Sequence, residues 1–418
     1  MAELWQRNHP QRDLLEKELQ QRFFPALQAP CRICHFMLTL APSSRQAEFL
    51  LMQQRAAALG VLLAEGDTDL NLQFDTFMLR WERHSEFSTF SFIYPGACAE
   101  FLPPEQYLPA ADWFDLLPGQ LFRVVQLLIV QGGPDAAHAP ELSRTFTTEH
   151  CISSWVAGQQ ARIWTDFRKH PEGGGRILLS DAGLSASALA RLVQQLFDLG
   201  NYRKLSLLGF PHSRQAVQQL HQLEQQLSDI THRIEQKQGS DEHLLHEISQ
   251  MAAQTEHLIA NNSARLEASA AYYQLTLDRL KALRESPVPG LMSLQDFSER
   301  RLTPAFRTAQ SVLQRQASLS SRLGRSTELL RTRINLQLER QNSALLASMD
   351  QRARQQLQLQ SAVERLSTVA ICYYAVQLLD KCWKSLLPLW PELPLTQLQA
   401  ISLPLVILLL AFWWYKLR

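Results

Sequence analysis

The chain has 418 residues, of which 41 are basic and 40 are acidic, and its formal net charge is +1. This length is too great for a single compact core and predicts two or three domains. The balanced charge argues against a general nucleic-acid binder, which would carry a positive excess.

The N-terminus and the cysteines indicate the cellular compartment in which the soluble part of the protein lies. No apolar stretch follows the charged N-terminal residues, so we expect no secretory signal peptide. Six scattered cysteines form no disulfide framework, which favours the cytosol. Cys31, Cys34 and His35 match the C-x-x-C-H string of c-type haem attachment, but that attachment requires export. We interpret them as buried residues of a strand over 31–40, with a thiol redox or zinc role as the alternative.

Residues 1–211 are predicted to form an α/β or α+β cytosolic domain. Segments with the two-residue period of strands alternate there with segments of helical period. Helices are expected over 43–60 and 186–199, and strands over 71–83, 86–94, 127–131, 161–167 and 176–179.

The following segments are predicted to be helical. Residues 212–290 are rich in Gln, Leu, Ala and Glu, and a break at Gly239 divides them into a helical hairpin. Residues 291–365 continue as one long stalk helix. Its apolar positions recur at close to an eleven-residue repeat: Leu319, Leu323, Leu330, Ile334, Leu338, Leu345 and Met349. Such a repeat is typical of a seam between packed helices, so we expect a coiled-coil stalk and a homo-oligomer.

Residues 366–418 are predicted to be a membrane anchor, a transmembrane helical hairpin with spans at about 366–388 and 395–415. No charged residue occurs between 400 and 415, and three aromatic residues at 413–415 precede Lys416 and Arg418. The lipid bilayer is therefore an expected partner. The distribution of basic residues predicts that both termini lie in the cytoplasm.

Charged residues gather on the predicted strands. On one strand, Glu82, His84 and Glu86 would share a face, with Arg83 on the other. Carboxylates beside an imidazole suit cation binding or acid–base chemistry, whereas a network with arginines would be structural. The candidate ligand-binding or structural polar cluster comprises Glu82, Arg83, His84, Glu86, Asp166, Arg168, Tyr202 and Arg203. No catalytic residue, metal ligand or cofactor is assigned.

Several strings carry a resemblance to a known family. They are residues 79–90, Trp164-Thr165-Asp166-Phe167-Arg168, the Tyr202-Arg203 pair with 207–211, and the run 329–374. With these strings the chain resembles the uncharacterised bacterial proteins grouped as domain-of-unknown-function family 3422. The resemblance implies a protein anchored in the bacterial inner (cytoplasmic) membrane and brings no established activity.

Three functions of different class remain open. The first is a membrane-anchored structural or interaction protein that oligomerises through its stalk. The second is an ion channel or transporter similar in build to CorA-type channels, although the Gly-Met-Asn motif of that family is missing here. The third is a membrane-tethered ligand sensor or enzyme that uses the polar cluster with an unknown small molecule. A non-enzymatic role is preferred.

Overall fold

The computed structural model describes residues 9, 11–12, 15–16, 23–96, 100–110, 112–132, 145–146, 150–386 and 395–417. The chain divides into two compact units. We call the first the sheet unit; it comprises residues up to Gln236 together with Glu247–Arg325. The second, the helical unit, comprises Lys237–His246 and Ser326–Arg418.

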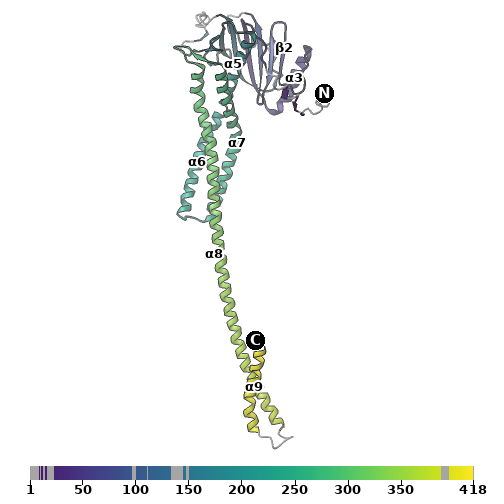
Figure 1. The fold of residues 1–418 in the computed structure, drawn as a ribbon, viewed down its shortest axis with the longest axis vertical. Helices are drawn as coiled ribbons and strands as arrows, with labels where there is room; N and C mark the ends of the chain where they lie inside the picture. The colour runs from purple at the N-terminus through teal and green to yellow at the C-terminus, as the bar shows by residue number, and fades with distance from the viewer. Residues whose placement is uncertain are drawn as a thin grey trace. The chain divides into compact units, whose positions relative to one another are not determined.

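The sheet unit is built on a mixed sheet, which has nine strands in the described residues (Figure 1). The strands are β1 (Cys31–Thr39), β2 (Asp69–Gln73), β3 (Met78–Arg83), β4 (Phe87–Pro95), β5 (Gln120–Gln131), β6 (Ile152–Val156), β7 (Ala161–Thr165), β8 (Gly175–Asp181) and β9 (Ser286–Pro287). Their order is β2-β3-β4-β1-β5-β8-β7-β6-β9. Neighbouring strands are antiparallel except β5 and β8, which are parallel.

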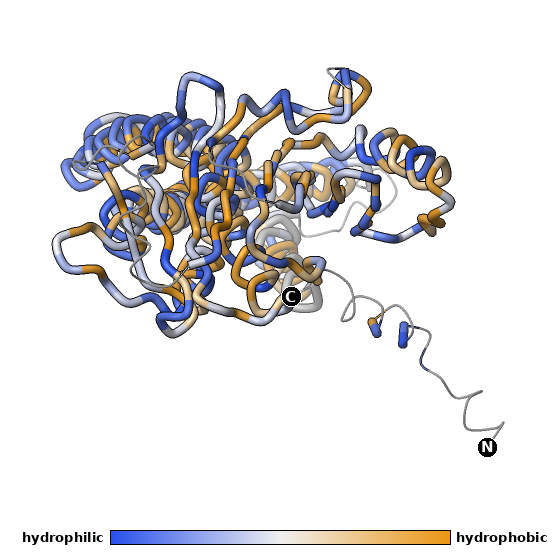
Figure 2. The backbone as a smooth tube through the Cα atoms, turned by 90° about the horizontal axis from the view of Figure 1, so that it is seen from above, coloured by the Kyte–Doolittle hydropathy of each residue, from blue (hydrophilic) through white to orange (hydrophobic). Residues whose placement is uncertain are grey.

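Each face of the sheet is covered by a helix. Helix α3 (Arg45–Ala58) contributes Met52 to the hydrophobic core on one face, and α5 (Ala186–Ser206) contributes Val193 to the core on the other. Side chains alternate between these cores along β1, where Ile33 joins the α5 side and Cys34 the α3 side. Figure 2 shows hydrophobic residues concentrated along the central strands.

The rest of the described chain is mostly helical. Its elements are the short helices η1 (Pro42–Ser44) and η2 (Pro104–Tyr107) and the long helices α6 (Gly209–Glu235), α7 (Asp241–Ala282), α8 (Leu294–Leu386) and α9 (Leu395–Leu417). Helix α8 begins where the Ser293 side chain accepts a hydrogen bond from the Asp296 amide at 3.0 Å. Within the sheet unit α8 packs on α6, where Arg315 pairs with Glu224 at 2.8 Å.

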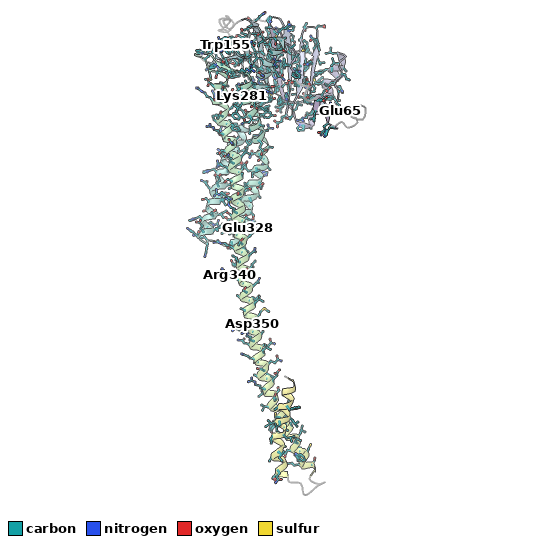
Figure 3. All side chains as sticks on the ribbon, viewed as in Figure 1. Glu65, Trp155, Lys281, Glu328, Arg340 and Asp350 are labelled. Atoms are coloured by element: carbon teal, nitrogen blue, oxygen red, sulfur yellow. The ribbon has the colours of Figure 1, made fainter. Side chains whose placement is uncertain are left out.

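The apolar stripe of the predicted stalk changes character along α8. Leu319, Leu323 and Leu330 are buried, whereas Leu338 and Leu345 are exposed by 51% and 59%. Every residue from 335 to 360 is exposed. In Figure 3 the side chains of Arg340 and Asp350 extend from α8 with no second helix beside them among the described residues.

The prediction of a transmembrane helical hairpin is wrong, and with it the membrane-anchored, transmembrane description of the chain. In the parts of the chain that the structure describes, no helix is both long enough and apolar enough to cross a membrane. The last turns of α8 carry Asp380, Lys381 and Lys384, and Lys384 pairs with Asp380 at 2.8 Å. The first turns of helix α9 carry the polar residues Thr396, Gln397 and Gln399.

Candidate functional site

The end of β7 forms one wall of the candidate site. Two side chains cap the backbone that leaves the strand: Thr165 accepts a hydrogen bond from the Phe167 amide at 3.3 Å, and Asp166 accepts one from the Arg168 amide at 3.0 Å. Phe167 has a φ of 52°, in the left-handed region that non-glycine residues rarely adopt. Asp166 also pairs with His170 at 3.1 Å. The segment therefore holds Phe167 in a strained backbone conformation, which is a feature of functional sites.

Helix α5 places Arg203 against this wall. The guanidinium carbon of Arg203 lies 3.5 Å from the centroid of the Phe167 ring, and that ring packs against Phe297 of α8 with 4.6 Å between centroids. The Nη1 atom of Arg203 is inaccessible to solvent and has no hydrogen-bond partner. A buried donor without a hydrogen-bond partner destabilises the folded state, so the presence of an arginine at position 203 requires an explanation.

Strand β5 contributes Arg123, which crosses α5 at Gly200. Nη1 of Arg123 donates to the side-chain oxygen of Asn201 at 2.8 Å and to the carbonyl oxygen of Phe197 at 3.4 Å. A Cβ atom on Gly200 would lie only 2.1 Å from Nη2 of Arg123. Glycine, which has no Cβ atom, therefore leaves room for the Arg123 guanidinium at this position of the helix.

A chain of hydrogen bonds through Asn201 and His35 holds Arg123 in place. Because the oxygen of Asn201 accepts from Arg123, its amide nitrogen donates to Nε2 of His35, at 3.1 Å. Nδ1 of His35 then carries the proton and donates to Ser91 at 2.8 Å. Burial, together with the charge of Arg123, lowers the pKa of His35 well below 6.5. The imidazole is therefore neutral and serves to orient Asn201.

These elements enclose a cavity of about 570 Å³, which we call the basic cavity. Seven cationic side chains line it, namely Arg123, Arg168, Lys169, Arg176, Arg203, Lys204 and Arg301. None of the described residues that line it is Asp or Glu. One of the seven, Arg176, has an acidic partner outside the lining, since it pairs with Glu172 at 2.6 Å.

The cations of the basic cavity raise the cost of one another's charge. Burial lowers the pKa of Arg123 to about 10, and burial with the charge of Arg123 lowers that of Arg203 to about 9. The pKa of Lys204 is also lowered by burial and then by Arg123, Lys169 and Arg203. Arg123 and Arg203 remain charged at neutral pH, so the cavity is a concentrated positive site.

A second cavity, of about 670 Å³, adjoins the first. We call it the neighbouring cavity. Four residues line both: Phe167, Arg168, Phe297 and Arg301. The remaining lining residues are His150, Cys151, Ile152, Asp166, Met292 and Arg300.

The eight residues of the predicted polar cluster lie in several places. Asp166, Arg168 and Arg203 meet at the two cavities. Glu86 pairs with Arg265 of α7 at 3.0 Å and accepts a hydrogen bond from Tyr272, on whose ring Tyr202 stacks.

The other three predicted residues have local partners. Glu82 accepts a hydrogen bond from Arg80 at 2.7 Å. The guanidinium of Arg83 lies 5.2 Å from the ring centroid of Phe49, a residue of α3, and the ring of His84 stacks on Phe87. Since β3 ends at Arg83 and β4 begins at Phe87, the residues between them form a hairpin turn, and the expected single strand face does not exist.

Sequence reasoning missed several lining residues of the basic cavity, namely Arg123, Lys169, Arg176, Lys204 and Arg301. The sequence contained a signal for one of these residues, Arg123. Gly200 interrupts a helical pattern, and a glycine in a helix often marks the close approach of another group. The predicted strand began at 127, too late to include Arg123, and the predicted helix ended at 199, before Arg203.

The C-x-x-C-H string does not form a shared site. Cys31 belongs to the core on the α5 side of the sheet and Cys34 to the core on the α3 side, so their thiols point in opposite directions. Among the described residues, no group of three or more His, Cys, Asp or Glu side chains is placed to hold a metal ion.

Comparison with known proteins gives one match. No curated protein and no solved structure matches the chain, so the similarity to CorA-type channels finds no support there. The family model described as protein of unknown function (DUF3422) matches residues 7–418. The chain therefore belongs to this family of proteins of unknown function.

Proposed function

We propose that the sheet unit binds an anionic small molecule in the basic cavity. The observation that carries the proposal is the lining itself, which combines seven cationic side chains with no carboxylate among its described residues. Arginine forks are suited to phosphate and carboxylate groups, which accept two parallel hydrogen bonds. The volume of about 570 Å³ lies within the range of small-molecule sites.

A purely structural role explains this lining poorly. Three other arginines of the sheet unit that are buried or half-buried have carboxylate partners, in the pairs Arg80–Glu82, Arg279–Asp198 and Arg315–Glu224. A desolvated charge without a partner destabilises the folded state by about 3 kcal/mol. An anion that neutralises Arg123 and Arg203 offsets this cost.

Binding is a better description of the basic cavity than catalysis. The described residues that line it offer cations, apolar surface and the Thr165 hydroxyl but no carboxylate or imidazole that would accept a proton. Asp166 and His170, which are not among the residues lining this cavity, contact each other at 3.1 Å.

Thermal unfolding in a series of anions tests the proposal. Sulfate, phosphate and pyrophosphate, each compared with chloride at constant ionic strength, should raise the melting temperature in order of charge, because a ligand that binds only the folded state stabilises it. Arg203→Met should abolish the increase. Arg191→Met, which removes an exposed arginine of the same helix, is the matched control and should preserve it. Equal melting temperatures in all four salts would contradict the proposal.

A second function, self-association through α8, is favoured by a separate observation. Residues 335–360 are exposed throughout, and they include Leu336, Leu338, Leu345, Leu346 and Met349, which are exposed by 49–66%. A helix that buries no apolar face against its own chain gains little stability from propensity alone.

We propose that a second copy of the chain covers this part of α8. Leu338, Leu345 and Met349 lie on one helix face at steps of seven and four residues, and an identical helix presents the same stripe in the same register. Mass measurement in solution tests it: a species heavier than the 47.8 kDa chain is expected. A monomeric mass at every concentration would overturn it.

A further inference from the structure

We infer that the ligand of the basic cavity is an organic polyphosphate whose phosphate groups lie among Arg123, Arg203 and Lys204 and whose organic part extends into the neighbouring cavity. This inference rests on the proposed anion binding and adds the class of ligand. It follows from three features of the two cavities.

The two cavities share a wall. The rings of Phe167 and Phe297, which pack at a tilt with 4.6 Å between their centroids, line both, as do Arg168 and Arg301. These four side chains are therefore within reach of a molecule bound in either cavity. A single elongated ligand can contact this wall along its length.

The cations are divided unequally between the cavities. Arg123, Lys169, Arg176, Arg203 and Lys204 line the basic cavity alone, whereas Arg300 is the one arginine confined to the neighbouring cavity among the described residues. One phosphate monoester carries a charge of about −2 and neutralises only a small part of the basic cavity. Two or more linked phosphates match it better.

The neighbouring cavity has the surface that an organic group requires. Ile152, Met292, Phe167 and Phe297 supply apolar and aromatic contacts, and binding sites for organic molecules are lined mainly by such groups. Its acidic residue, Asp166, already accepts a hydrogen bond from the Arg168 amide and contacts His170. Aromatic faces at the junction are suited to a flat ring that follows a phosphate chain.

The test compares ligands that share the phosphate part and differ in the organic part. Calorimetric titration of the full chain should give a dissociation constant for ADP or UDP at least about tenfold lower than for pyrophosphate, which corresponds to about 1.4 kcal/mol. Met292→Trp, which fills the neighbouring cavity, should remove this gain and leave pyrophosphate binding unchanged.

The outcomes separate the two proposals. If pyrophosphate does not bind, the proposed anion binding fails together with the inference. If pyrophosphate binds but neither nucleotide binds more tightly, only the organic polyphosphate is rejected. A tighter nucleotide that stays tight in Met292→Trp places its organic part elsewhere and also overturns the inference.

Discussion

The guanidinium of Arg203 lies 3.5 Å over the ring of Phe167, and one of its nitrogens is buried without a hydrogen-bond partner. The aromatic ring compensates the charge only in part, since such contacts contribute about 0.5–2 kcal/mol. Arg123, the charged neighbour that lowers the pKa of Arg203, is itself a cation. Arg203 is therefore held in a position that an anion would make favourable.

Arg203→Met is expected to stabilise the protein in the absence of added anions. Methionine keeps the apolar contact with Phe167 and removes an uncompensated charge, so the free energy of unfolding should rise by about 1–2 kcal/mol. Urea unfolding in chloride buffer measures it. A loss of stability greater than in the Arg191→Met control would show that Arg203 is structural.

Gly200→Ala is expected to weaken anion binding with little change in stability. The new Cβ would overlap the Arg123 guanidinium, which must leave its hydrogen bond to Asn201. Because the displaced atoms are the end of a flexible side chain, and alanine gains about 1 kcal/mol of helix propensity, the effects on stability nearly cancel. Affinity for pyrophosphate should fall by about tenfold, or ~1.4 kcal/mol.

Gly324→Ala is the control for this change. Gly324 also lies in a helix, and a Cβ there meets nothing within 4 Å. The variant should gain about 1 kcal/mol in stability and bind pyrophosphate as the wild type does. Equal affinities for Gly200→Ala and Gly324→Ala would remove Arg123 from the binding site.

The protonation of His35 predicts a loss of stability in acid. Burial and Arg123 hold its pKa well below 6.5, so below that pH the unfolded chain takes up a proton that the folded chain does not. The stabilisation is present above pH 6.5 and is lost, by about 1.4 kcal/mol per pH unit, as the pH falls. In His35→Phe, which retains the stack on Phe197, this contribution should vanish. Parallel pH profiles for the two proteins would contradict it.

Self-association should depend on the exposed stripe of α8. The double variant Leu338→Gln, Leu345→Gln changes two positions on one helix face and is expected to reduce the mass in solution to that of a single chain. The control, Leu336→Gln with Leu346→Gln, removes the same number of exposed leucines off the stripe and should leave the mass unchanged. Loss of mass in both variants would show that apolar surface in general, and not the stripe, drives association.

Local patterns predicted the helices better than they predicted the strands and the site. The Gln- and Leu-rich segments contain almost no glycine or proline, and α6, α7 and α8 follow them. The single strand predicted over 71–83 missed the turn between β2, which ends at Gln73, and β3, which begins at Met78.

The candidate site depends on contacts between distant residues, which a single sequence does not reveal. Arg123 and Asn201 are 78 positions apart, and their hydrogen bond exists only because β5 passes under α5. The Trp164–Arg168 string and Arg203 were identified from the sequence. Their association with Arg123 and Phe297 required the fold.

Isothermal titration of the full chain with pyrophosphate, at constant ionic strength, tests anion binding most directly. The wild type and Arg191→Met should bind one equivalent with the same affinity. Arg203→Met should bind at least about tenfold more weakly, a difference of ~1.4 kcal/mol or more. Undetectable binding to the wild type, or equal binding by Arg203→Met, would contradict the assignment of the basic cavity as an anion site.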